Sequence, residues 1–158
     1  MYKYIFLVVA ILFIGCTTTI PYTSSKAYYM VIKNPKIALA DTGFVKKDDT
    51  RLNLQIFSAS SPIFDLHVEN QVCLNAICFA KEAFNYEFFN FRHYENFIEE
   101  LFNLQPIYNQ KNIQKNENGF EQRIKTNSYD ITYKVENNNL YFKDKKNGIL
   151  IKLKELKK

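Results

Sequence analysis

The stretch 128–156, SYDITYKVENNNLYFKDKKNGILIKLKEL, decides the fold of this protein. Apolar and polar side chains alternate through Ser128–Val135, as expected of a strand with one buried and one solvated face. The polar runs Asn137–Asn139 and Lys146–Gly148 divide the stretch into three strands, and the Asn-Gly pair in the second run is a strong signal for a tight hairpin turn. The stretch therefore predicts an antiparallel meander.

The same two-residue period continues upstream. In Arg51–Phe57 every second residue is Leu or Ile, and Asn and Gln stand between them. Repeated alternation with polar turns at short intervals indicates an antiparallel sheet with one solvated face. The Asn-, Lys- and Gln-rich run Gln110–Asn118 is expected to be an exposed loop. Further strands are predicted at Ala27–Ile32, Ile37–Val45, Arg51–Phe57, Phe64–Val68, Val72–Phe79, Phe84–Phe89 and Phe120–Lys125.

The apolar period changes once, from that of a strand to that of a helix. One apolar stripe predicts a helix over Tyr94–Leu104, with Asn90 as a candidate cap and Pro106 as its stop. One helix among many strands makes the fold class α+β and mostly antiparallel β. The stripe consists of Tyr94, Phe97, Ile98, Leu101 and Phe102.

The N-terminus has the pattern of a secretory leader. Lys3 precedes the almost unbroken apolar run Tyr4–Gly15, which is short for a span of a bilayer and typical of a signal peptide. The block Leu12–Cys16 resembles the lipobox of bacterial lipoproteins, which implies cleavage before Cys16 and acylation of that residue. The alternatives are an ordinary signal peptide with an incidental cysteine and an uncleaved anchor. The expected division is residues 1–15 as signal peptide, 16–25 as acylated cysteine and tether, and 26–158 as a single β-rich domain.

Acylation at Cys16 would hold the domain on a membrane, because two or three acyl chains give a stable anchor. Thr17 follows the cysteine, where an Asp retains lipoproteins in the inner membrane of many diderm bacteria. The expected location is therefore the outer membrane, facing the periplasm. Anchoring in the inner membrane or on the cell surface is the alternative.

The two other cysteines, Cys73 and Cys78, suit a disulfide. An exported domain is in an oxidising compartment, and four residues between the cysteines allow a bridge at the end of a hairpin. The alternatives are a metal site and free thiols. The two histidines, His67 and His93, have no ligand spacing with this pair, so no metal and no cofactor are expected.

Charge does not indicate a nucleic-acid protein. The formal net charge is +5, or +4 without Lys3, and the lysines are scattered along an exported chain. Only the C-terminal tail is dense in lysine. A solvated strand face explains that tail, and contact with anionic lipid head groups is the alternative. The tail lysines are Lys152, Lys154, Lys157 and Lys158.

No arrangement of residues indicates catalysis. The four glycines are isolated, so a phosphate-binding loop is absent from the sequence, and so is a Gly-x-Ser-x-Gly elbow. His67 and Asp65 share a strand face, which predicts a surface contact better than part of a triad. Glu99 and Glu100 lie off the apolar stripe and fit a solvated helix face. The protein is expected not to be an enzyme.

The order of leader, antiparallel sheet, helix and closing meander resembles the LolA/LolB family of lipoprotein carriers, in particular its LolB-like outer-membrane acceptors. The likeness covers roughly residues 51–156 in outline. The family's Gly-Trp step is absent, because the chain has no Trp. The residues that carry the resemblance are Arg51–Leu54, Tyr94–Leu104 with Pro106, Gly119–Gln122, Tyr129–Tyr133 and Ile149–Leu153.

The resemblance implies a curved, half-barrel-like sheet with the helix packed across it and an apolar cavity for acyl chains. Phe97 and Leu101 would then face inward, toward Ile131 and Tyr133. The implied function is a carrier or acceptor that binds acyl chains or lipoproteins. The alternative is an envelope lipoprotein with a filled core that contacts another envelope protein.

Overall fold

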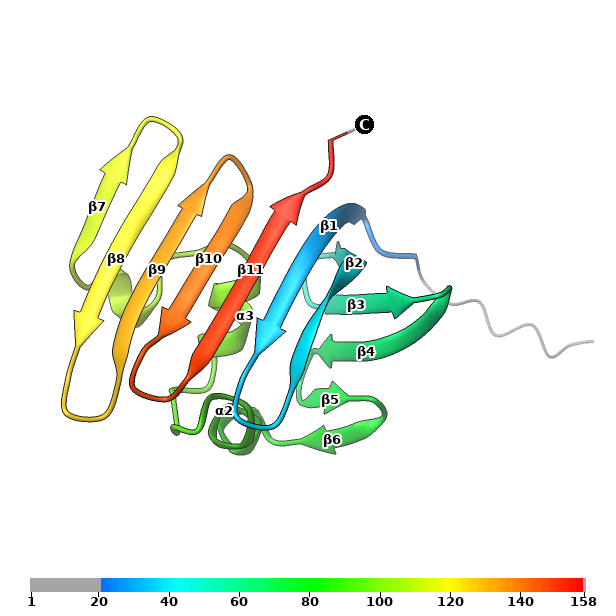
Figure 1. Cartoon of the computed structure of the whole chain (residues 1–158), viewed down its shortest axis with the longest axis horizontal. Coiled ribbons are helices and arrows are strands. Elements are labelled where there is room, and N and C mark those ends of the chain that lie inside the picture. The colour runs from blue at the N-terminus through cyan, green and yellow to red at the C-terminus, as the bar shows by residue number, and fades with distance from the viewer. Residues whose placement is uncertain (1–20, 158) are drawn as a thin grey trace, which may run out of the picture.

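The computed structural model describes residues 21–157, which form one open antiparallel sheet of eleven strands (Figure 1). The strand order is β6-β5-β4-β3-β2-β1-β11-β10-β9-β8-β7, so the N-terminal and C-terminal halves join where β1 pairs with β11. The strands are β1 Ser24–Lys33, β2 Ala38–Lys47, β3 Leu52–Ser58, β4 Ser61–Val68, β5 Val72–Leu74, β6 Ile77–Phe79, β7 Ile113–Asn116, β8 Gly119–Lys125, β9 Asp130–Glu136, β10 Asn139–Asp144 and β11 Ile149–Glu155.

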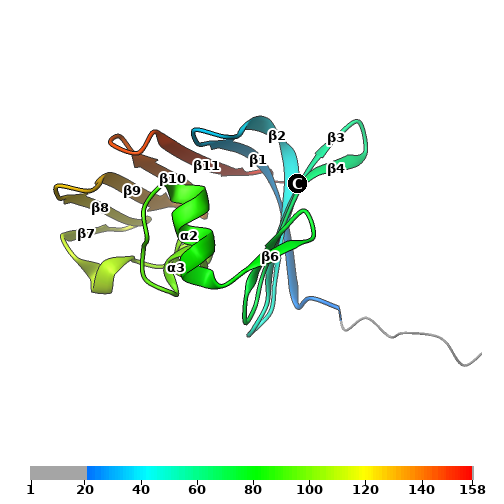
Figure 2. The same cartoon turned by 90° about the horizontal axis from the view of Figure 1, so that it is seen from below.

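The sheet is strongly curved, and the two helices lie on its concave side (Figure 2). α2 (Lys81–Phe89) and α3 (Phe97–Phe102) connect the edge strand β6 to the second half of the sheet, followed by the short 3₁₀ turn Tyr108–Gln110. The expected fold class is confirmed. The protein is α+β, mostly antiparallel β, with a curved, half-barrel-like sheet.

The alternating pattern read from the sequence sets the two faces of the sheet. In β9, Ile131, Tyr133 and Val135 are buried beneath the helices, and the residues between them face outward. The inner faces of the strands and the helices share one core, in which aromatic side chains are prominent. Its largest fully buried side chains are Tyr133, Phe64, Phe84, Phe89, Phe97, Phe102, Phe142 and Met30.

The helical segments differ from the prediction of one helix over Tyr94–Leu104. The structure has two short helices, and α3 covers only the central six residues of the predicted range. Phe84–Phe89, predicted to be a strand, belongs to α2. The buried side of that helix consists of Phe84, Asn85, Phe88 and Phe89. In the sequence alone, a short apolar run of this kind fits both the period of a strand and the period of a helix. Asn90, the candidate N-cap of the second helix, instead ends α2 in the left-handed conformation.

Two predicted boundaries also move. The expected loop Gln110–Asn118 contains strand β7, which pairs with β8 along the register from Ile113–Gln122 to Asn116–Gly119. Backbone pairing outweighs the low strand propensity of this polar run. β1 begins at Ser24, two residues inside the expected tether.

The leader and Cys16 lie outside the described residues. Within residues 21–157, no helix combines the length and the apolar character that a membrane crossing requires.

Candidate site for an apolar ligand

The four predicted cavity residues meet in the core. Phe97 and Leu101 come from α3, Ile131 and Tyr133 come from β9, and all four are at most 1% exposed. The Tyr133 hydroxyl donates a hydrogen bond to the Leu101 carbonyl at 3.2 Å, which ties α3 to the sheet. Burial raises the pKa of Tyr133, so this donor stays protonated. The four side chains are therefore packed core in this structure.

A continuous column of aromatic rings runs from the edge of α2 to these central residues. Neighbouring rings in the column have centroids about 5–6 Å apart and mostly meet edge to face, the geometry that aromatic pairs prefer. The column links one end of the molecule to its centre without a polar interruption. In order it contains Phe79, Phe84, Phe88, Phe89, Phe97, Phe142, Tyr133 and Phe120.

A pocket of about 160 Å³ opens to solvent at the α2 end of this column. Its walls come from four segments, namely the β1–β2 connection, β5, β6 and α2. The wall is almost wholly apolar, and the rings of Phe84 and Phe88 form its inner side. Apolar concave surfaces with a few polar groups at the rim are the usual form of a small-ligand site. The lining residues are Asn34, Lys36, Ile37, Leu74, Phe79, Phe84, Glu87 and Phe88.

The polar groups of the pocket are arranged at its rim. Lys36 and Glu87 form an ion pair at 2.5 Å, with both side chains largely exposed. Buried Asn34 donates from Nδ2 to the Phe88 carbonyl at 3.0 Å, and its Oδ1 accepts from the Ile37 amide at 2.7 Å. Asn34 therefore fixes the β1–β2 connection against the end of α2. It satisfies backbone groups that the pocket would otherwise leave unpaired.

The two helices that cover the core are short. α2 has nine residues and α3 has six, and neither start carries a side-chain cap. Helices of this length are marginal in water, so packing on the sheet is what stabilises them. The Lys81–Glu99 ion pair at 2.7 Å joins α2 to α3, and Asn85 donates a hydrogen bond to the Tyr94 carbonyl of the connecting segment at 2.8 Å.

The segment between the helices contains a buried histidine. The His93 ring stacks on Phe97 with centroids 3.8 Å apart, and its Nδ1 lies 2.6 Å from the Tyr108 hydroxyl. Burial lowers the pKa of His93 to about 4, although the Asp144 carboxylate raises it in part. Nε2 is buried and has no hydrogen-bond partner within the described residues. His93 is thus a neutral component of the aromatic core at pH 7.

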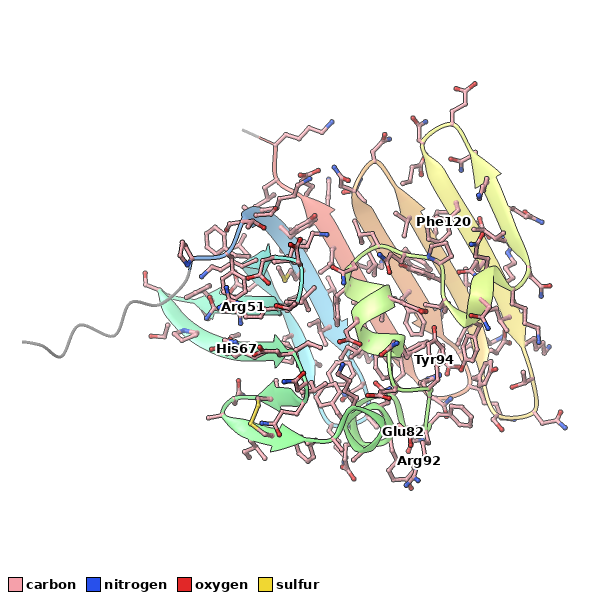
Figure 3. The ribbon with its side chains drawn as sticks, turned by 180° about the vertical axis from the view of Figure 1, so that it is seen from behind. Arg51, His67, Glu82, Arg92, Tyr94 and Phe120 are labelled. Atoms are coloured by element: carbon pink, nitrogen blue, oxygen red, sulfur yellow. A yellow bond between two sulfur atoms is a disulfide. The ribbon has the colours of Figure 1, made fainter. Side chains whose placement is uncertain are left out.

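Tyr94, labelled in Figure 3, joins the same segment to α3 and to the 3₁₀ turn. Its hydroxyl donates to Glu100 of α3 and accepts from the Tyr108 amide at 3.0 Å.

Gln122 on β8 is fully buried and holds the loop that follows α3 in place. It accepts from the Ile107 amide at 2.9 Å and donates to the Lys111 carbonyl at 2.8 Å. Gln122 belongs to Gly119–Gln122, one of the segments that carry the resemblance, and its hydrogen bonds hold the chain that follows α3 against β8.

Cys73 and Cys78 form a disulfide across paired positions of β5 and β6. The tip of this hairpin carries Ile77, which is 65% exposed, and Leu74 from the same hairpin lines the pocket. The disulfide thus fixes one wall of the pocket. The exposed Ile77 side chain lies next to that wall.

Reduction of this disulfide is expected to loosen the hairpin without unfolding the domain. Closing so short a loop removes modest chain entropy, so its loss should lower the free energy of unfolding by about 2 kcal/mol. Maleimide should label both cysteines only after reduction, and urea unfolding of the Cys73→Ser/Cys78→Ser variant measures the stability change. Labelling of the folded, unreduced protein at both positions would show free thiols instead.

The other polar candidates do not form a reactive site. His67 Nε2 lies 3.0 Å from Asp65 Oδ1 on the outer face of β4, where half of the His67 side chain is exposed, and Asn53 is the next polar neighbour (Figure 3). Within residues 21–157, His, Cys, Asp and Glu side chains do not gather in groups that would hold a metal ion. The polar side chains on this surface therefore offer hydrogen bonds and ion pairs.

Comparison with protein-family models and with curated protein sequences finds no match. The site is therefore interpreted from its geometry.

Sequence reasoning identified the central residues but not the pocket. The sequence pattern places Ile37 in one predicted strand and both Leu74 and Phe79 in another, Val72–Phe79, which the structure divides into β5 and β6. Part of the pocket, its Phe84 and Phe88 side, had a signal in the sequence. The spacing of Phe84 and Phe88 places both rings on one side of a helix, and a helical assignment of Lys81–Phe89 would have pointed them at the same neighbours.

Proposed function

We propose that this protein is a membrane-anchored, non-catalytic envelope lipoprotein that binds acyl chains, as a LolB-like acceptor in the localisation of lipoproteins to the outer membrane. The observation that carries the proposal is the apolar pocket between α2, β6 and the β1–β2 connection, whose inner side is the first part of the aromatic column. An acyl chain needs an apolar surface continuous from solvent to the interior, and this is such a surface.

The pocket as it stands accommodates only the end of an acyl chain. Further binding requires the rings of Phe84 and Phe88 to move away from the sheet together with α2. The short, uncapped helices support such a movement, because the chain would replace the apolar contacts that are lost. The movement also breaks the hydrogen bond from Asn34 to the Phe88 carbonyl. The Lys36–Glu87 pair at the rim gives a polar border where the chain leaves the pocket.

Replacing Ile37 with Asp is expected to weaken binding of a fluorescent fatty acid by at least about tenfold. The carboxylate would stand in the apolar wall, and an acyl chain there would remove its water without offering a hydrogen bond. Titration of the fatty acid with wild-type and variant protein measures the change. Thermal melting confirms that each protein is folded.

The matched control is Ile113→Asp, the same substitution at another partly buried isoleucine that packs against the core. Ile113 lies on β7, at the opposite edge of the sheet from β6. Fatty-acid affinity should be unchanged in that variant. Equal weakening by both substitutions, or no binding by the wild-type protein, would refute the proposed site.

The anchor is tested separately with Cys16→Ser. If Cys16 is acylated, the variant should accumulate as unprocessed precursor and take up no labelled palmitate. The wild-type chain should incorporate the label and fractionate with membranes. Normal maturation and membrane fractionation of Cys16→Ser would contradict the lipid anchor, whatever the domain binds.

A second candidate function is an envelope lipoprotein that acts as a protein-interaction or structural module. The observation in its favour is the dense packing around Phe97, Leu101, Ile131 and Tyr133, which leaves these side chains fully buried. The apolar pocket and exposed Ile77 would then receive a side chain of a partner protein. This candidate expects no fatty-acid binding, so the same titration separates the two functions.

A further inference from the structure

Exposed apolar side chains gather on the outer face of the sheet, away from the pocket. Six large hydrophobic residues within the described chain are exposed, and two of them, Ile77 and Tyr86, lie near the pocket. Of the other four, three lie at outward positions of β1, β2 and β4, and the fourth directly follows β11. We call these four the outer apolar patch: Tyr29, Phe44, Ile63 and Leu156, which are 43%, 41%, 38% and 44% exposed.

The register of the sheet brings members of the patch close to one another. Phe44 pairs with Ala27, whose carbonyl accepts a hydrogen bond from the Leu156 amide. Tyr29 stands one outward position further along β1. Phe57 extends the patch toward Ile63, with its ring 6.0 Å from that of Phe44. Apolar groups scattered singly on a surface need no explanation, but apolar groups that gather in this way mark a contact surface.

Lysines border the patch on the side of β11. Lys154 pairs with Tyr29, and Lys152 pairs with Val31 on the same outer face. The Lys152 ammonium lies over the Tyr141 ring at 5.5 Å. Two acidic groups on this face, Asp65 and Glu121, have polar or cationic neighbours. Asp65 contacts His67, and Glu121 contacts both Arg123 and Lys134. Aromatic rings beside exposed lysine side chains suit the interface of an anionic bilayer.

The proposed anchor would hold this face close to a membrane. The described chain begins on the outer side of the curved sheet (Figure 2). There the Arg51 guanidinium lies 4.7 Å from the centre of the Tyr22 ring, and Thr23 donates to the Lys47 carbonyl at 3.1 Å. Only six residue steps separate Tyr22 from Cys16, a span of at most about 20 Å. A tether of that reach, leaving from the outer side, favours contact between the outer face and the bilayer.

We propose that the outer apolar patch and its lysines rest on the anionic surface of the membrane to which Cys16 is anchored. The concave side, with the pocket beside α2, then faces away from the bilayer and toward the aqueous compartment. This inference rests on the lipid anchor of the proposed function but not on acyl-chain binding in the pocket. It gives the anchored domain one orientation, in which the pocket is accessible to a ligand delivered from solution.

The chain contains no Trp, so one introduced Trp reports on its surroundings. The test uses the full mature, acylated protein with Phe44→Trp, reconstituted into phosphatidylcholine vesicles that contain phosphatidylglycerol and brominated lipid. The matched control is Tyr86→Trp, an aromatic replacement at a 52% exposed position on α2. Bromine quenches Trp only at short range. We expect several-fold greater loss of fluorescence for Phe44→Trp than for Tyr86→Trp.

Charge reversal provides the second measurement. Lys152→Glu/Lys154→Glu in the Phe44→Trp background should reduce the quenching in anionic vesicles, because these lysines border the patch without lining the pocket. Equal quenching at positions 44 and 86 would overturn the proposal, since the domain would have no fixed orientation. An unquenched Trp at position 44 in vesicle-bound protein would also overturn it and indicate a protein partner for the patch. Failure of the acylated wild type to float with vesicles would remove the anchor, whereas fatty-acid titration tests the pocket independently.

Discussion

Replacing Phe97 with Ala is expected to lower the free energy of unfolding by about 3–5 kcal/mol. The Phe97 ring is fully buried at the point where α3 meets the sheet. It stacks on His93 and packs edge to face with Phe89 and Phe142, so its removal leaves a void bordered by these three rings. Urea unfolding followed by circular dichroism measures the change.

Phe44→Ala is the matched control, because it deletes the same side chain from the outer face, where 41% of Phe44 is exposed. Its cost should be about 1 kcal/mol or less. A similarly small cost for Phe97→Ala would mean that the space beneath α3 is not tightly packed. The result bears on function, since a large loss at Phe97 means that acyl chains must displace close-packed rings.

Acidification is expected to destabilise the domain through His93. Its pKa falls from the ordinary 6.5 to about 4, because burial disfavours the imidazolium. Between these values the unfolded chain binds a proton that the folded chain does not. The stability is therefore fully present above about pH 6.5 and is lost progressively as the pH falls toward 4. The complete loss amounts to about 3 kcal/mol.

Other groups also titrate in this range, so the effect is measured as a difference between proteins. His93→Phe should remove this part of the pH dependence, whereas His67→Phe, at a half-exposed position on the outer face, should leave it unchanged. Urea unfolding at several values of pH from 4 to 7 provides the comparison. Parallel pH profiles for wild type and His93→Phe would show that the imidazole protonates in place, with solvent reaching Nε2.

The sequence could predict the sheet because alternation is a local property. In Arg51–Phe57 and Ser128–Val135 every second side chain is apolar, and those side chains became the inner face. Polar turns such as Asn147-Gly148 set the strand boundaries. The spacing of Cys73 and Cys78 likewise indicated a short hairpin, and the two residues pair across β5 and β6. Each of these features depends on neighbours a few residues apart.

Local pattern was insufficient where a segment fits two structures. The aromatic run Phe84–Phe89 reads equally as a strand or as a helix, and its place over the concave sheet decided for α2, because both Phe84 and Phe88 gain burial there. The polar run Ile113–Asn116 has little strand propensity. It became β7 because β8 offered it an unpaired edge.

The sequence by itself determined the inward-facing residues of strands such as β3 and β9, the turn at Asn147-Gly148 and the buried residues of α3. Only the tertiary structure decided the candidate surfaces. The pocket joins Ile37, Leu74, Phe79 and Phe88, and the outer apolar patch joins strands from both ends of the chain. Sheet order and register bring such residues together through hydrogen bonds between distant backbone segments, and a one-residue shift in that register would send each side chain to the opposite face.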